Sequence, residues 1–443
     1  MIEIEARLDE LKALGLHRRT RLVSGPQGPH VLLDGKPVLL LCSNNYLGLA
    51  DHPRVREAAA DAAMRWGIGA GGSRLASGTM TIHRRLEERL AAFLGRERAL
   101  LFGSGYLATA GAIAALARPG DVIFSDAFNH ASVADGCQLS RAEIFVYDHG
   151  DVEHLAWGIE QAQGRGALIV TDSVFSVDGD VAPLADIVEL AQHHGIRVLV
   201  DEAHGIGAVG PGGRGALAES GLEDEVDVII GSLGKAFGSY GAFVACDAAM
   251  ERYLVNAART FLFSTALPPP AVAGALAALG LLRERPHRVE KLAANAAVLR
   301  RGLEREGFDV AGSRTQIVPL VVGDAELTAK LGEAALLRGI FAQVIHPPAA
   351  PEGSSRLRLA VMATHREEEL ARAARTLGGV ARSLGVAPRP PARPVPEPAP
   401  APAPTRDRTR RAQPITALAA DEGSAARGVF DFEAPDPVRR AAA

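Results

Sequence analysis

Cysteine, aromatic residues and long apolar runs are all scarce in this sequence. Its 443 residues include only three cysteines, Cys42, Cys137 and Cys246, which lie far apart and show neither a CxxC pair nor metal-ligand spacing. This spacing predicts neither a disulfide framework nor a zinc site. No apolar run reaches the roughly 18 residues that a membrane-spanning helix needs, and no signal peptide is recognisable. We therefore predict a cytoplasmic protein without a metal site or a membrane span.

An excess of charge of either sign is also missing. The 48 Lys and Arg residues nearly balance the 52 Asp and Glu residues, which gives a formal net charge of -4. Such a balance provides no field that would attract nucleic acid or an anionic membrane, so neither partner is predicted. The hydrophobic content of 47% is enough for a large core, and the length suggests two or three domains at roughly 150 residues each.

Short apolar runs alternate with helix-patterned segments between residues 95 and 245. The runs are rich in β-branched residues and are bounded by Gly, Asp and Ser, as buried strands are. They occupy residues 99–102, 121–126, 167–172, 197–201, 227–232 and 241–246. This alternation predicts an α/β fold with a buried parallel or mixed sheet and helices on both faces. In such sheets ligands bind beyond the carboxyl ends of the strands, so the polar residues there are the first functional candidates.

The flanking segments divide the rest of the chain into regions. We predict an N-terminal segment over residues 1–50, a large domain over 51–285, a smaller C-terminal α/β domain over 286–385 and a tail over 386–443. The tail is rich in Pro, Ala and Arg and has little apolar surface to bury, so we predict that it is extended and disordered. Its one apolar stretch, residues 429–432, suits either a short binding motif or a passive tail.

One lysine stands directly after a predicted buried strand. Lys235 ends the sequence SLGK, residues 232–235, and small residues flank it. Burial would lower the pKa of its amine toward the free base that attacks carbonyl carbons. The pattern is also common in solvated surface loops, so its meaning depends on the residues that share its edge of the sheet.

Three other strand ends carry groups that complement such a lysine. Asp201 ends the run VLVD and His204 follows it; a buried carboxylate there needs a cation, such as a protonated pyridine nitrogen. His130 follows the strand over 121–126, and residues 103–106 lead into a helix whose first N–H groups can bind phosphate. Each residue alone could be a paired, capping or turn residue. Together with the lysine they form the set that a pyridoxal-phosphate (PLP) site needs.

Longer segments of the chain resemble a known family, the α-oxoamine synthases, which are PLP enzymes of the aspartate-aminotransferase fold (fold type I). The resemblance covers residues 1–384. It is strongest over residues 43–53, 69–95, 125–142, 171–184, 201–215, 231–243, 259–269 and 356–365. It implies a large domain with a mixed sheet, a smaller C-terminal α/β domain and a homodimer. One departure is Ser173, which stands where the family pattern has glycine.

The resemblance also implies roles for individual residues. Among the catalytic residues, Lys235 would hold the cofactor covalently and His130 would stack on its ring. Asp201 would bind the ring nitrogen, and His204 would lie beside the phenolic oxygen. The other implied cofactor contacts are Gly105, Tyr106, Ser176, Ser232 and, from the neighbouring subunit, Thr265. The implied substrate-binding residues are Asn44, Arg356 and Arg18, with Arg19 and Arg21 close enough to take the place of Arg18.

The motifs SRLASGT, NHASVADGC and ARTFLFSTALPP are most similar to family members that form 8-amino-7-oxononanoate in biotin biosynthesis. The implied substrates are L-alanine and a pimeloyl thioester, carried by CoA or by acyl carrier protein, with loss of carbon dioxide. Members that form 2-amino-3-ketobutyrate from glycine and an acyl-CoA share many of these motifs and are the alternative. A PLP fold that serves as a scaffold for a working tail is the alternative outside enzymes.

Overall fold

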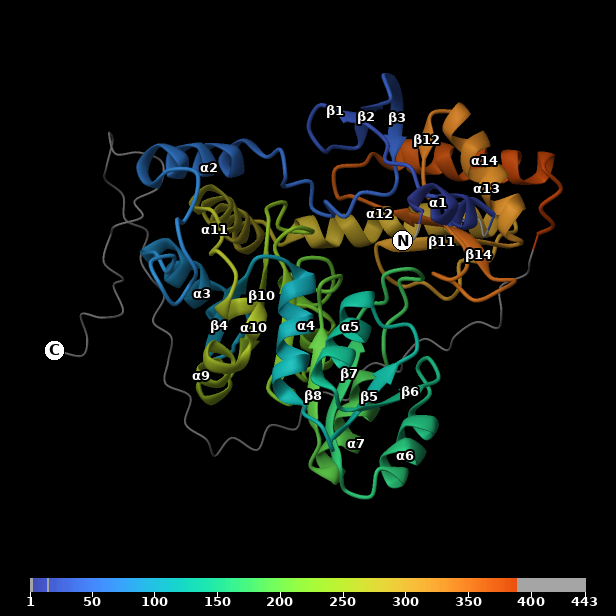
Figure 1. Ribbon diagram of the computed structural model, residues 1–443. Helices are drawn as coiled ribbons and strands as arrows, with labels where there is room; N and C mark the ends of the chain where they lie inside the picture. Colours follow the sequence, from blue (N-terminus) through green and yellow to red (C-terminus); the bar gives the residue numbers. More distant parts are fainter. Residues whose placement is uncertain (1–2, 14–15, 389–443) are drawn as a thin grey trace.

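The computed structural model describes residues 3–13 and 16–388. Most of the predicted tail over residues 386–443, including its apolar stretch at 429–432, therefore lies outside the described residues. The described part forms a larger α/β domain and a smaller domain, and the long helix α12 (His287–Arg305) runs between them (Figure 1). No helix in the described ranges is long and apolar enough to cross a membrane.

A seven-stranded sheet forms the centre of the larger domain, with the strand order β4-β10-β9-β8-β7-β5-β6. Its strands are β4 (Arg98–Phe102), β5 (Val122–Asp126), β6 (Glu143–Tyr147), β7 (Gly166–Asp172), β8 (Arg197–Asp201), β9 (Val228–Ser232) and β10 (Ala242–Cys246). β5 to β9 pair in parallel, whereas β10 runs antiparallel to β4 and β9. The predicted mixed sheet is confirmed, and each predicted strand starts and ends within one residue of an observed one.

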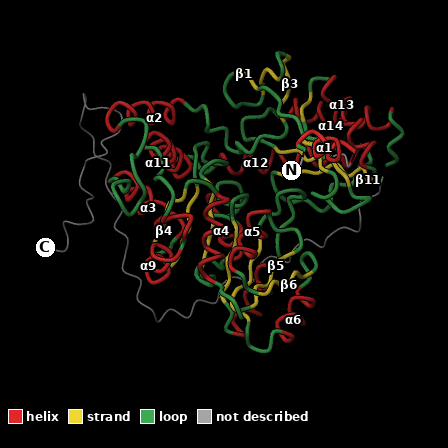
Figure 2. Tube along the Cα trace, in the orientation of Figure 1, coloured by secondary structure: helices red, strands yellow, loops and turns green. Residues whose placement is uncertain are grey.

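Both faces of this sheet are buried, which explains why its strands are apolar throughout. Alternate strand residues point to opposite faces; in β8, Val198 and Val200 join one core while Leu199 joins the other. The first core includes α2 (Pro53–Trp66), α3 (Thr81–Leu94), α6 (Val152–Gln161), α7 (Leu184–His194), α8 (Ala216–Ser220) and α11 (Pro269–Glu284). The second includes α4 (Gly105–Leu116), α5 (Ala131–Ser140), α9 (Ala248–Ala257) and α10 (Arg259–Leu262). Figure 2 shows these strands in yellow among the red helices.

The smaller domain combines segments from both ends of the described chain. One sheet has the order β11-β14-β13 and consists of β11 (Ile317–Gly323), β13 (Gln343–Ile345) and β14 (Ser355–Ala360). The other has the order β1-β2-β3-β12 and consists of β1 (Val23–Ser24), β2 (His30–Leu33), β3 (Lys36–Leu40) and β12 (Ile340–Phe341). Helices α12, α13 (Ala325–Leu337) and α14 (Glu367–Ser383) pack against these strands, whereas α1 (Ile4–Ala13) has no buried residue.

The N-terminal segment is therefore not a separate layer, because β12 pairs in parallel with β3 and ties residues 36–40 to the C-terminal part of the chain. The domain limits at residues 50, 285 and 385 stay predictions. The smaller domain also meets the large sheet at its carboxyl edge. Thr315, just before β11, donates from Oγ1 to the Gly179 carbonyl at 2.9 Å, and Gly179 lies in the loop that follows β7. The candidate site lies at this meeting point.

Candidate active site

Lys235 stands in a tight loop that follows β9. The Gly238 N–H donates to the Lys235 carbonyl at 2.9 Å. Gly238 has a φ of +60°, and a Cβ added to it would lie 2.3 Å from the Ala50 nitrogen, so this loop requires glycine. Burial lowers the pKa of the Lys235 amine to about 8, although the negative charges of Asp201 and Asp172 oppose the shift. The lysine is thus a shielded amine that is partly uncharged near neutral pH.

Asp201 and His204 lie at the end of β8 and are held by their neighbours. Thr109 of α4 donates from Oγ1 to Asp201 Oδ2 at 2.9 Å, and the Ala203 N–H donates to Oδ1 at 2.9 Å. His204 Nδ1 lies 2.6 Å from the Tyr46 hydroxyl. Burial lowers the pKa of His204 well below its usual value, and the nearby positive charge of Lys235 adds to the shift. The site therefore combines a fixed carboxylate with a neutral imidazole.

His130 forms the N-cap of α5, where its Nδ1 accepts from the Ser132 N–H at 3.2 Å. Burial lowers the pKa of His130, the negative charge of Asp201 opposes that shift, and the positive charge of Lys235 adds to it. Both charges act on the imidazole because the ends of β5, β8 and β9 meet at this edge. The three predicted catalytic groups from different strands thus share one region.

The start of α4 provides backbone donors at the same edge. Ser104 is the N-cap and its Oγ accepts from the Leu107 N–H at 3.2 Å. The N–H groups of the next residues, Gly105 and Tyr106, belong to the first turn of the helix, which lacks intrahelical partners and attracts anions. A Cβ added at Gly105 would meet nothing within 4 Å, so the backbone there is open to a ligand. The Tyr106 hydroxyl donates to Asp135.

Asp172 is a site residue that the sequence did not single out. It ends β7 and is paired in register with Asp201 on β8. Its Oδ1 is buried and has no hydrogen-bond partner among the described residues. Burial and the charge of Asp201 raise the pKa of Asp172 well above its usual value. A buried polar atom of this kind is normally satisfied, so it points to a bound group that the protein itself does not supply.

Two buried arginines of β14 face the site, and they have different partners. Arg356, which the sequence predicted, pairs with Asp178 and donates from Nε to the Ser354 carbonyl at 2.8 Å. Arg358, which it did not predict, donates to the carbonyl of Ser176 and, at 3.1 Å, to Asn44 Oδ1. The positive charge of Arg358 also contributes to the lowered pKa values of Lys235 and His204. The structure therefore brings Arg358 together with Asn44, whereas Arg356 is bound to a carboxylate of its own. The two-residue spacing in RLR places both arginines on one strand face, which is the signal that could have identified Arg358.

Three other predicted residues have local roles. Ser232 Oγ accepts from the Gly234 N–H at 3.3 Å at the start of the lysine loop. Arg18 and Thr265 are exposed, and Thr265 forms an isolated antiparallel bridge with Ser73. In the described ranges, neither of these two residues has a hydrogen bond or ion pair with Lys235. Arg21, the neighbour considered in place of Arg18, pairs with Asp34 and Glu333.

Ser173, the departure from the family pattern, has a defined partner. Its Oγ donates to Glu202 Oε2 at 2.7 Å, and the N–H groups of Ala216 and Leu217 donate to the same carboxylate at 3.1 Å and 2.7 Å. Burial nevertheless raises the pKa of Glu202 to about 6. The hydroxyl thus anchors the residue between Asp201 and His204 without occupying the site.

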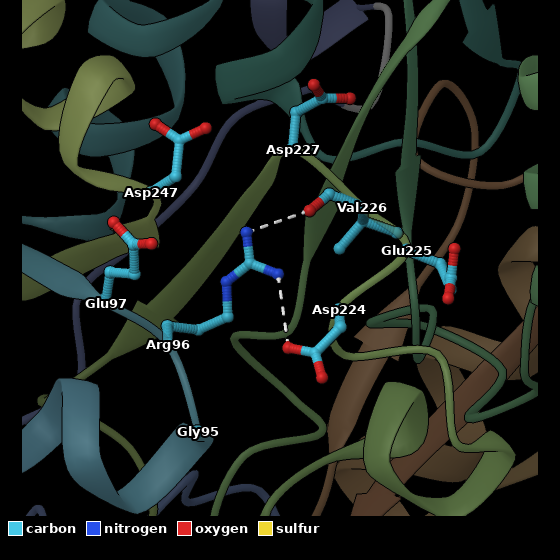
Figure 3. Close-up of a pocket in the computed structure, with 8 residues that line it drawn as sticks. All are labelled: Gly95, Arg96, Glu97, Asp224, Glu225, Val226, Asp227 and Asp247. Atoms are coloured by element: carbon cyan, nitrogen blue, oxygen red, sulfur yellow. Dashed lines mark hydrogen bonds and ion pairs between the residues drawn. The ribbon is translucent and has the colours of Figure 1, made fainter. Parts of the chain in front are cut away.

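A separate pocket lies at the opposite edge of the large sheet, lined by residues 95–97, 224–227 and 247 (Figure 3). Arg96 points into it, donating to the Val226 carbonyl at 3.0 Å and lying 4.0 Å from Asp224. None of the predicted catalytic residues lines this pocket. The candidate active site is therefore the carboxyl edge around Lys235.

The groups at that edge fit PLP. A cationic ring nitrogen suits Asp201, a phenolic oxygen suits His204, a phosphate suits the start of α4, and an aldehyde carbon suits Lys235. The open backbone at Gly105 and the unpartnered oxygen of Asp172 are consistent with a ligand of this size and polarity.

Comparisons with known proteins agree with this site. Residues 36–377 match the family "Aminotransferase class I and II". An 8-amino-7-oxononanoate synthase from Citrifermentans bemidjiense is 51% identical over 382 residues, which cover 86% of this chain and 98% of that protein. A solved structure of SPT with PLP (33% identity) and the serine palmitoyltransferase of Sphingomonas wittichii (32% identity) both superpose with a TM-score of 0.82 and cover 87% of this chain and 98% of their own. The family and fold that the sequence motifs predicted are confirmed. The chain therefore belongs to the aminotransferase class I and II family.

Proposed function

We propose that this protein uses PLP to condense L-alanine with a pimeloyl thioester, releasing carbon dioxide and forming 8-amino-7-oxononanoate. The observation that supports this function best is the convergence of Lys235, Asp201 and Arg358 at one sheet edge, in a chain that is 51% identical to an 8-amino-7-oxononanoate synthase. Bound at this edge, PLP would withdraw electrons from the α-carbon of the amino acid. The residues of the protein bind and orient the cofactor and the substrate, and they move the proton.

Groups from several elements would hold the cofactor in this proposal. Asp201 would bind the ring nitrogen, and because Thr109 and Ala203 already donate to its two oxygens, its orientation is fixed. His130 would contact the ring, and its lowered pKa favours the neutral imidazole. The start of α4 would bind the phosphate together with Ser232, and His204 and Ser176 would provide the other polar contacts.

Lys235 moves the proton in this reaction. Burial keeps the pKa of its amine at about 8, so near neutral pH a useful fraction is the free base. That amine would hold the cofactor covalently and, as a free base, would remove the proton from the α-carbon of L-alanine. The same ammonium group can return a proton to the product.

Arg358 and Asn44 bind the carboxylate of L-alanine in this proposal. The guanidinium of Arg358 is buried, and its fork geometry matches a carboxylate. Its contacts with Ser176 and Asn44 fix its direction. Arg356 supports the neighbouring loop through Asp178, and this assignment replaces the role that the sequence gave to Arg356.

We also propose a cytoplasmic homodimer with shared active sites. Leu75 and Phe263 are 60% and 72% exposed and lie in two paired loops, which the Ser73–Thr265 bridge joins. A second subunit packed there would cover this apolar surface and bring Thr265 toward the phosphate of its neighbour. Arg18 would complete the substrate side.

Steady-state kinetics of the purified holoenzyme test the function. L-alanine, glycine and L-serine are each assayed with acetyl-CoA, pimeloyl-CoA and palmitoyl-CoA. We expect the highest kcat/KM for L-alanine with pimeloyl-CoA, and the carrier is then compared by using pimeloyl-acyl carrier protein. A preference for glycine with a short acyl-CoA would instead support formation of 2-amino-3-ketobutyrate.

A further inference from the structure

His149 lies in the loop after β6, between two carboxylates from different parts of the chain. Its Nδ1 is 2.9 Å from Asp126 Oδ1, and its Nε2 is 2.9 Å from Asp180 Oδ2. Asp126 ends β5 and is almost fully buried, and Asp180 lies in the loop between β7 and α7, residues 173–183. One imidazole thus joins three loops at the carboxyl edge of the sheet.

The geometry favours the charged form of this imidazole. An ionised carboxylate only accepts hydrogen bonds, so two carboxylates within hydrogen-bond distance favour an imidazolium in which both ring nitrogens of His149 donate. Burial opposes the charged form, but the hydrogen bonds to Asp126 and Asp180 outweigh it and raise the pKa of His149 to about 10. Phe128 stacks on the ring at 4.3 Å and Phe175 meets it edge-on at 4.4 Å. The two aromatic rings hold the imidazolium and limit its access to water.

The loop over residues 173–183 carries the contacts of both site arginines. Its Ser176 carbonyl accepts from Arg358, and its Asp178 pairs with Arg356. Within the loop, the Phe175 N–H donates to the Asp180 carbonyl at 3.0 Å. Asp180 is therefore linked by one backbone hydrogen bond to Phe175, which precedes Ser176. A movement of Asp180 would be transmitted through these residues to Arg358.

The other end of this connection is fixed to the sheet. Asp126 Oδ1 also accepts from the Phe128 N–H at 2.8 Å, and Oδ2 accepts from the Gly150 N–H at 2.9 Å. Asp178, in the same loop, has Arg356 as its cation. Without the imidazolium, Asp126 and Asp180 would lose the cation that they share.

We propose that His149 is a positioning residue, which holds the loop over residues 173–183 against the sheet so that Arg358 is aimed at the carboxylate of the amino-acid substrate. The inference rests on the proposed function, because it assigns that carboxylate to Arg358. Among the described residues, His149 has no hydrogen bond or ion pair with Lys235, and it reaches Arg358 through Asp180, Phe175 and the Ser176 carbonyl.

The test compares His149→Gln with a matched control, His154→Gln, in the holoenzyme. His154 pairs with the exposed Asp148 at 3.3 Å, and its ring contacts in the described part of the chain are with Phe145 and Trp157, outside the loop over 173–183. For His149→Gln we expect the KM for L-alanine to rise about tenfold while the KM for pimeloyl-CoA changes less than about twofold, since only the carboxylate subsite is misaligned. The control should keep wild-type values for both constants.

Thermal unfolding of the holoenzymes gives a second readout. Because folding raises the pKa of His149 from 6.5 to about 10, its stabilisation is complete below pH 6.5 and is lost as the pH rises through 10. The difference in Tm between wild type and His149→Gln should therefore shrink between pH 6.5 and 10, and His154→Gln should show no such trend. If His149→Gln does not fold, Asp180→Asn replaces it in the test, because this variant keeps the contact between His149 and Asp126. We expect Asp180→Asn to raise the KM for L-alanine as well, by a smaller factor.

A lower stability with an unchanged KM for L-alanine would overturn the inference, because His149 would then be only a structural residue. Failure of the proposed function looks different: wild type itself would not turn over L-alanine with pimeloyl-CoA. In that case, the dissociation constant of the amino acid that wild type does use is measured from the absorbance of the bound cofactor. Equal dissociation constants for His149→Gln and wild type would overturn the inference.

Discussion

The two edges of the central sheet both collect acidic side chains, and they use them differently. At the carboxyl edge, Asp172 and Asp201 are 3% and 7% exposed, and both charges act on the Lys235 amine. At the opposite edge, three carboxylates of the pocket in Figure 3 accept backbone N–H groups at 3.0, 2.8 and 2.6 Å. These residues are Glu97, Asp227 and Asp247.

The difference separates a reactive site from a structural one. The three carboxylates at the opposite edge each fix a strand or a helix start through a backbone N–H group. A buried carboxyl with an unpartnered oxygen, such as Asp172 beside Asp201, gains much from a bound group that supplies the missing contact. Concavity and acidic composition alone would have favoured the edge opposite the candidate site.

The largest expected effect comes from Lys235→Ala. Because the proposed role of this lysine is covalent, turnover should fall below about a thousandth of wild type, and the absorbance of the covalently held cofactor should disappear. Circular dichroism should still show a folded protein. Retained turnover with a normal cofactor spectrum would remove the carboxyl edge from consideration as the active site.

The position of Lys235 could be predicted from sequence because strands buried on both faces give continuous apolar runs, and the polar residue after each run falls on the ligand-binding edge. The same reasoning located Asp201 and His130. It could not pair His149 with Asp126 and Asp180, which are 23 and 31 positions away, because only the packed loops bring them together. It also missed β6, an edge strand in which Ile144 and Val146 remain 37% and 54% exposed.

The next largest effect is expected for Asp201→Asn. An amide cannot hold the ring nitrogen of the cofactor in its protonated form, so kcat should fall by about a hundredfold to ten-thousandfold. Asp224→Asn is the matched control from the opposite edge, since the Asp224 side chain is 86% exposed. Rate constants that are equal in the two variants would erase the distinction between the edges.

A moderate effect should separate the two arginines of β14. Arg358→Gln removes the charged donor that we propose for the substrate carboxylate, so we expect the KM for L-alanine to rise about thirtyfold. Arg356→Gln mainly leaves Asp178 without its cation, so it should lower Tm and raise that KM less than about fivefold. Steady-state kinetics and thermal melts of both variants make this comparison. A larger change in KM for Arg356→Gln would return the carboxylate-binding role to Arg356.

The smallest effect is expected at the opposite edge, for Asp247→Ala. Asp247 is the N-cap of α9 and its Oδ1 accepts from the Met250 N–H at 2.6 Å, which satisfies a backbone donor that the helix itself leaves unpaired. Losing such a cap costs about 1 kcal/mol of folding free energy, which chemical denaturation can measure. The values of kcat and KM should stay at those of wild type, because the cap acts on the start of one helix and α9 packs in the core away from Lys235. A drop in kcat without a loss of stability would show that the pocket in Figure 3 communicates with the carboxyl edge, and the two edges could then no longer be treated as independent.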